Sequence, residues 1–158
     1  MGIDRIIIDF FFVGCDPATY HFDADALIAD TVKIELAECE NDDPEEFFID
    51  EDHIPSFDYG NAKIIDSLDP GQFESFIVGL AAITFHIEED YSANMPIGRT
   101  LILHQSNGDM IVLSCNGFDG EYYSFASLFD SNSHFIAHIA NFADAPSFDE
   151  LLNAYFPS

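Results

Sequence analysis

Two histidines stand four residues apart near the end of the chain, at His134 and His138. The surrounding residues predict a helix over 134–142 with Ser133 as its cap, and four-residue spacing puts both imidazoles on one helix face. Such a pair could share a Zn²⁺ ion, which is one hypothesis for a metal-dependent hydrolase. Catalytic pairs of this kind usually have Glu directly after the first His, whereas Phe135 stands there. We therefore expect no bound metal.

Other residue types that could do chemistry form no recognisable pattern. Cys15, Cys39 and Cys115 are widely spaced and contain no CxxC pair, which favours reduced thiols in a cytoplasmic protein. Carboxylates are so abundant that an acid–base pair can be chosen anywhere, so none is informative without geometry. The sequence also contains no glycine-rich phosphate loop. It predicts no cofactor and no enzymatic activity.

The charge is the most informative property of the chain. Asp and Glu number 30 against 4 Lys and Arg, giving a formal net charge of -26 over 158 residues. Nucleic acid and anionic membranes would be repelled, because binding them requires Lys and Arg. The hydrophobic share of 48%, with 17 Phe and 6 Tyr, is far above that of a disordered chain. We expect one acidic globular domain over 1–158, with a basic protein as partner.

The acidity is concentrated after Lys33, and no Lys or Arg lies between Lys33 and Lys63. Carboxylates there could steer and pair with a basic partner, while the embedded aromatic side chains could serve as buried anchors. Alternatively, the Phe residues could fold back into the core. The predicted partner-binding residues are Glu38, Glu40, Asp42, Asp43, Glu45, Glu46, Phe47, Phe48, Asp50, Glu51 and Asp52.

In size, charge and lack of catalytic motifs, the chain resembles immunity proteins of bacterial nuclease toxins, including those of contact-dependent inhibition. The resemblance implies an inhibitor whose carboxylates take the place of substrate phosphates in a basic cleft of the toxin. Three alternatives remain open. The chain could be a DNA-mimic inhibitor of another nucleic-acid-binding protein, a hydrolase using His134 and His138, or an acidic domain from a halophile.

The elements that must position these residues follow from hydrophobic periodicity and turn residues. An apolar run at 6–13 predicts a buried central strand. Asp69 followed by Pro70 predicts a helix start, and Ser147 with Glu150 forms a capping box. Val32, Ile34 and Leu36 alternate with Lys33 and Glu35, which predicts a half-buried strand over 32–36. Asp23 or Asp25 could cap a short helix that continues to Asp30. Further strands are predicted near 83–88, 100–105, 110–115 and 122–125, and further helices at 134–142 and 147–155.

The clearest local feature is a hairpin around Asn107-Gly108, which joins two apolar strands. Asn-Gly favours a two-residue turn in which both residues have positive φ. The hairpin indicates antiparallel pairing, and no regular alternation of strand and helix occurs. We therefore predict an α+β fold, with a mainly antiparallel sheet and three or four helices packed on one face.

Overall fold

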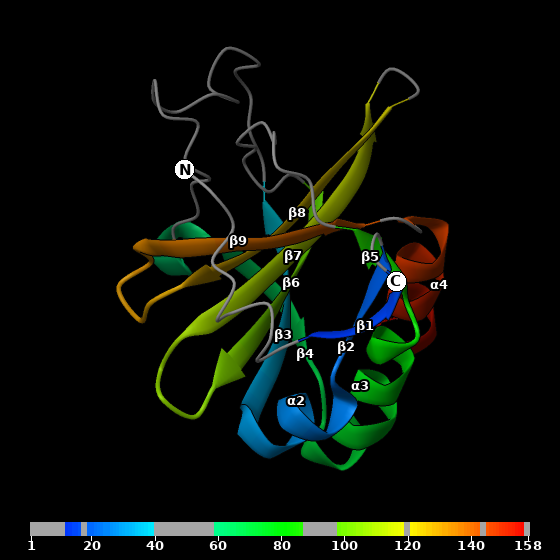
Figure 1. The fold of residues 1–158 in the computed structure, drawn as a ribbon. Coiled ribbons are helices and arrows are strands. Elements are labelled where there is room, and N and C mark those ends of the chain that lie inside the picture. The colour runs from blue at the N-terminus through cyan, green and yellow to red at the C-terminus, as the bar shows by residue number, and fades with distance from the viewer. Residues whose placement is uncertain are drawn as a thin grey trace.

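One antiparallel sheet organises the molecule. The computed structural model describes residues 12–16, 19–39, 59–86, 98–118, 121–142 and 145–156. In these ranges nine strands follow one another in the order β1-β2-β5-β9-β8-β7-β6-β3-β4 (Figure 1). They are β1 (Phe12–Asp16), β2 (Thr19–Phe22), β3 (Thr31–Cys39), β4 (Lys63–Ser67), β5 (Phe85–His86), β6 (Gly98–Gln105), β7 (Met110–Phe118), β8 (Glu121–Phe129) and β9 (Phe135–Phe142).

Three α-helices in the described residues lie together on one side of this sheet (Figure 1). They are α2 (Ala24–Asp30), α3 (Phe73–Ala81) and α4 (Ala145–Tyr155), and short 3-10 turns occur at η2 (Tyr59–Asn61) and η3 (Pro70–Gln72). The fold is thus α+β with a mainly antiparallel sheet, as the sequence predicts. The helix number matches the lower of the two expected values.

The helix starts follow the capping signals only in part. The Asp23 carboxylate accepts a hydrogen bond of 3.2 Å from the backbone of Ala26 and caps α2, as expected. Asp69 and Pro70 begin a 3-10 turn that leads into α3. Helix α4 begins at Ala145, so Ser147 lies inside its first turn. The prediction that Ser147 is the N-cap of this helix is therefore wrong.

The predicted helix over 134–142 is wrong, because these residues form strand β9 between β8 and β5. The apolar residues of this segment have a spacing that both a helix and a strand can accommodate. Phe and Ile favour strands where neighbouring strands supply hydrogen-bond partners on both sides. Tertiary pairing therefore overrides the helical pattern.

The hairpin of β6 and β7 is confirmed, but its turn differs from the prediction. Only Gly108 has a positive φ, of 97°, and its backbone N–H donates to the Gln105 carbonyl at 3.0 Å. The Asn107 side chain accepts from the backbone N–H of Asp109 at 2.9 Å. This geometry matches a type I turn followed by a left-handed glycine.

The first strand is not central. Phe12 and Val13 belong to β1, the terminal strand at one end of the sheet. The remaining residues of the predicted run, 6–11, lie outside the described residues. The central position among the nine strands goes to β8, which follows the hairpin of β6 and β7.

Alternate residues of β3 point to two different hydrophobic clusters. On the helix face, Ile34 and Leu36 pack with side chains of the three helices, including the fully buried Phe76. On the second face, Ala37 joins a smaller cluster with Ile102, Met110, Val112 and Phe129. Because both faces are apolar, β6 and β7 are continuous hydrophobic strands.

Candidate functional site

The predicted partner-binding segment lies almost wholly outside the described residues. Glu38 is the exception, and it stands on β3 opposite Lys63 of β4 and Arg99 of β6. The other members, Glu40, Asp42, Asp43, Glu45, Glu46, Phe47, Phe48, Asp50, Glu51 and Asp52, are not described. Of the predicted partner-binding residues, the structure therefore places Glu38 alone, near the end of β3.

The two histidines considered for a metal are not on a common helix. His134 lies in the turn before β9, with 77% of its side chain exposed, and His138 lies within β9 opposite Ser127. His134 Nδ1 is 3.4 Å from the carboxylate of Asp130. The helical argument for a shared zinc ion is thus removed. The described residues contain no group of three or more His, Cys, Asp or Glu that could hold a metal.

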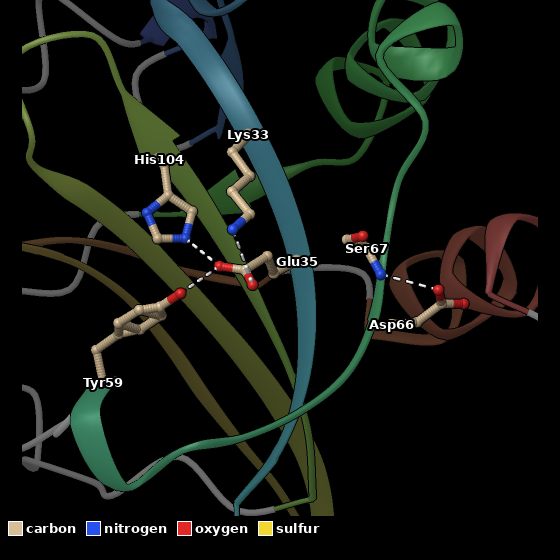
Figure 2. A network of polar contacts seen from close by, with 6 residues as sticks. All are labelled: Lys33, Glu35, Tyr59, Asp66, Ser67 and His104. Atoms are coloured by element: carbon tan, nitrogen blue, oxygen red, sulfur yellow. Dashed lines mark hydrogen bonds and ion pairs between the residues drawn. The ribbon is translucent and has the colours of Figure 1, made fainter.

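A different polar cluster is buried on the second face of the sheet, centred on Glu35. This residue is 4% exposed, although it carries a carboxylate in the middle of β3. The Tyr59 hydroxyl donates to Glu35 Oε1 at 2.7 Å, and His104 Nε2 lies 2.5 Å from the same oxygen. Lys33 Nζ is 3.5 Å from Oε2 (Figure 2). We call these four residues the Glu35 cluster.

Three separate elements bring the Glu35 cluster together. Lys33 and Glu35 are two apart on β3, so they share a strand face. His104 comes from β6, where it pairs with Lys33 across the ladder. Tyr59 comes from η2, and its ring meets the His104 ring edge-on with centroids 5.1 Å apart. The cluster therefore joins the sheet to the chain that returns to it at residue 59.

Electrostatics keep Glu35 ionised despite its burial. Loss of hydration alone would raise the pKa of its carboxyl, but several contacts act in the opposite direction. The hydrogen bonds from Tyr59 and His104, with the charges of His104 and Lys33, leave the pKa below the usual 4.5. Burial, together with the hydrogen bond and charge of Glu35, raises the pKa of Tyr59 to about 12. The pair is thus a neutral phenol donating to a carboxylate.

The backbone of Tyr59 is also held in place, by a contact with Ser133. Its backbone N–H donates to Ser133 Oγ at 2.9 Å. Ser133 has a φ of 65°, a left-handed conformation that glycine or asparagine usually occupies. The Asp130 carboxylate supports this turn by accepting from the backbone N–H groups of Asn132 and His134, each at 2.9 Å. A costly backbone conformation therefore places a hydroxyl where it can hold Tyr59.

The contacts within the Glu35 cluster hold its four side chains in fixed positions relative to one another. Oε1 receives Tyr59 and His104, and Oε2 faces Lys33, so the donors and acceptors are directed at one another. A carboxylate that has two hydrogen-bond partners at one oxygen and an ammonium group near the other is a firm anchor. Sequence reasoning missed this cluster, because the alternation of residues 32–36 predicts that Glu35 faces solvent. The continuous apolar runs of β6 and β7 were the available signal that both faces are covered.

Strand β4, beside the Glu35 cluster, forms one end of the sheet and is exposed at all five residues. Its apolar residues Ile64 and Ile65 are 37% and 45% exposed. A register shift interrupts its pairing with β3, Lys63 begins the strand, and the Asp66 carboxylate accepts from the Ser67 backbone N–H at 2.8 Å (Figure 2). Bulges and charges of this kind disfavour addition of a further strand.

The chain matches no protein-family model, and no curated protein or solved structure is significantly similar to it. In the described part of the chain, no helix is long and apolar enough to cross a membrane. Function is therefore inferred from charge and geometry.

Proposed function

We propose that the chain is an acidic, protein-binding inhibitor that neutralises a basic partner, and within that class an immunity protein that blocks a nuclease toxin. The single observation that carries this proposal is the net charge of -26, which results from 30 Asp and Glu against 4 Lys and Arg. A field of this strength accelerates encounter with a basic protein and repels nucleic acid.

The arrangement of the cations supports the same proposal. Lys33 is paired with Glu35, and Arg99 is held on α4 by Asp149 at 3.8 Å and by Asn153 at 2.7 Å. Two of the four cations thus serve internal contacts. Within the described ranges, the exposed acids without an ion pair to Lys, Arg or His include Asp25, Asp66, Asp69, Glu74 and Glu150.

In the proposed mechanism, carboxylates of residues 38–52 occupy the sites that substrate phosphates take in a basic cleft. Charge pairs at interfaces of this kind couple by about 1.5–7 kcal/mol. Phe47 and Phe48 would supply apolar anchors, and such anchors usually carry most of the affinity. In the sequence, residues 40–58 are preceded by Glu38 on β3 and followed by Tyr59 of η2, which packs against the second face of the sheet.

The test is capture of partners from the native cell, with two variants of equal net charge. The first variant reverses Asp42, Asp43, Glu45 and Glu46 to Lys. The matched control reverses four exposed acids elsewhere, namely Asp25, Asp66, Asp69 and Glu74, to Lys. We expect the wild type and the control to retain a basic nuclease and the first variant to lose it, mainly through slower association.

Each other outcome has a definite meaning. Equal loss in both variants would indicate that overall charge, and not residues 38–52, determines binding. Capture of a DNA-binding protein without nuclease activity would replace the immunity proposal with the DNA-mimic alternative. Retention of full affinity by the first variant would exclude this segment as the interface. A Phe48→Ala variant then tests the anchors separately from the charges. If Phe48 is an anchor, the variant should dissociate faster and lose about 2 kcal/mol or more of binding free energy.

A further inference from the structure

The second face of the sheet has a small apolar cluster and a short segment lying over it. The cluster consists of Ala37, Ile102, Met110, Val112 and Phe129, all buried. Tyr59 and Ala62 pack against it, and we call residues 59–62 the strap. The Ala62 backbone N–H donates to the Tyr59 carbonyl at 3.2 Å, so the strap is one short turn.

Tyr59 attaches the strap to the rest of the protein through three contacts. Its hydroxyl donates to Glu35, its ring packs edge-on against His104, and its backbone N–H donates to Ser133. After Ala62 the chain enters β4, whose five residues are all exposed. Burial of the alanine side chain contributes little. Among these attachments, the hydrogen bond to the Glu35 carboxylate is the one with a charged partner, and such bonds are about twice as strong as neutral ones.

We propose that ionised Glu35 is a latch, and that its neutralisation releases the strap locally while the helix face of the sheet stays folded. Among the residues that the structure describes, the titratable and charged groups that face the latch are Lys33 on β3, His104 on β6 and Tyr59 on η2. Both basic groups favour the ionised carboxylate, and the phenol donates to it. Release uncovers the apolar cluster, including Ile102 and Phe129. The proposal does not depend on the identity of the binding partner.

The direction of the pH effect follows from Glu35. Its pKa in the folded protein is below the usual 4.5, so the latch is closed at neutral and mildly acidic pH. Stability from a carboxyl with a lowered pKa is present above the unfolded-state value. It is lost as pH falls through the folded-state value. The strap should therefore open in acid, before the sheet unfolds.

The test is amide hydrogen exchange of the full chain, read at residues 59–62 and at residues 111–113 of β7. We expect Glu35→Gln to raise exchange in the strap at least ~10-fold at neutral pH, while β7 stays far more protected than the strap. Asp149→Asn is the matched control, because it neutralises a carboxylate paired with Arg99 at 3.8 Å and does not contact the strap. The control should leave exchange in the strap unchanged.

A pH series on the wild type provides a second, independent measurement. After correction for intrinsic exchange, strap protection should fall as the pH drops below 4.5, ahead of β7 protection, and a dye specific for apolar surface should bind as it falls. In Glu35→Gln, strap protection should not change over this range. If strap and β7 lose protection together in the wild type, or if Glu35→Gln leaves the strap protected, the latch does not exist. A Glu35→Gln variant that fails to fold would also overturn the proposal of local release.

Discussion

The two faces of the sheet are stabilised in different ways. On the helix face, Leu27, Phe76, Phe148 and many others form one large cluster without an ionised group at its centre. On the second face, a small apolar cluster lies beside a buried carboxylate and a single tyrosine. Apolar packing is non-directional and spread over many contacts, so losing one contact is a partial loss. Hydrogen bonds to Glu35 are directional and few, so each of them matters individually.

The difference shows how a strongly acidic protein can still bury a carboxylate. A free buried charge would cost several kcal/mol, and it persists only where donors satisfy it. Glu35 has Tyr59, His104 and Lys33 around it, although the chain has only 4 Lys and Arg in total. One of these rare cations thus serves a structural site.

The largest expected effect is on the helix face. Phe76 is fully buried and packs edge-on against Tyr155 and Phe156, at centroid distances of 5.2 and 6.0 Å. Phe76→Ala should lower the free energy of unfolding by about 3–5 kcal/mol, measured by denaturant titration. Val78→Ala on the same helix is the control, because Val78 is 54% exposed, and it should change stability by about 0.5 kcal/mol or less. Similar losses in both variants would contradict this view of the helix face.

The next effect is on the second face. Glu35→Ala removes the common partner of three groups, and we expect a loss of about 3 kcal/mol in the free energy of unfolding at neutral pH. The exposed Glu150 on α4 is the control, where Ala should cost about 0.5 kcal/mol or less. The two faces would be stabilised alike, contrary to our interpretation, if Glu35→Ala were as mild as the control.

A smaller effect is expected from the tyrosine that donates to Glu35. Tyr59→Phe keeps the ring and removes the hydroxyl, so it should cost about 1.5 kcal/mol at neutral pH. Tyr155→Phe removes a hydroxyl that contacts Ser75 Oγ at 2.9 Å on an exposed surface, and it should cost less. Equal costs for the two variants would argue against a special role for the Glu35 hydrogen bond.

The effect of Tyr59→Phe on stability should also depend on pH in alkali. Unfolded tyrosine ionises near its usual pKa of 10.0, whereas Tyr59 keeps its proton up to about 12 in the folded protein. The folded state then binds more protons between these values, so stability falls as pH rises from 10 towards 12. The difference in unfolding free energy between wild type and Tyr59→Phe should shrink over this range. A difference that stays constant over this range would contradict the raised pKa of Tyr59.

The smallest effect concerns the turn that holds the Tyr59 backbone. Ser133→Ala loses the acceptor for the Tyr59 N–H and keeps the strained φ of 65°. Ser133→Gly also loses the acceptor but relieves the strain, so it should be more stable than Ser133→Ala by about 0.5–1 kcal/mol. Thermal denaturation of the two variants measures the difference. An Ala variant at least as stable as the Gly variant would show that the backbone there is not strained.

Elements stabilised by short-range interactions could be predicted from the sequence. Asp23 caps α2 through a residue three positions away, and Gly108 provides the positive φ of the hairpin turn. The α+β class follows from such elements together with the absence of regular strand–helix alternation. In contrast, β9 could not be distinguished from a helix, because its apolar spacing fits both structures. The segment is a strand because it pairs with β8 on one side and, on the other, with β5, which is distant in the sequence.

The Glu35 cluster could not be predicted for the same reason. Lys33, Glu35, Tyr59 and His104 come from three stretches of the chain, and within β3 the residues 32–36 have the alternation of a strand with one solvent-exposed face. In the structure Val32 is 59% exposed and Glu35 is buried, because a register shift near the start of β3 changes the pattern and η2 covers the second face. Burial of Glu35 is thus a property of the assembled sheet.

Composition and local pattern by themselves determined the acidic surface, the antiparallel α+β class, the start of α2 and the hairpin. These features depend on charge count, hydrophobic content and hydrogen bonds between residues close in sequence. Only the tertiary structure decided that β9 is a strand, that β1 lies at an end of the sheet and that Glu35 is held ionised inside it. Those features depend on which distant segments meet, since pairing partners and loss of hydration arise only when the sheet is assembled.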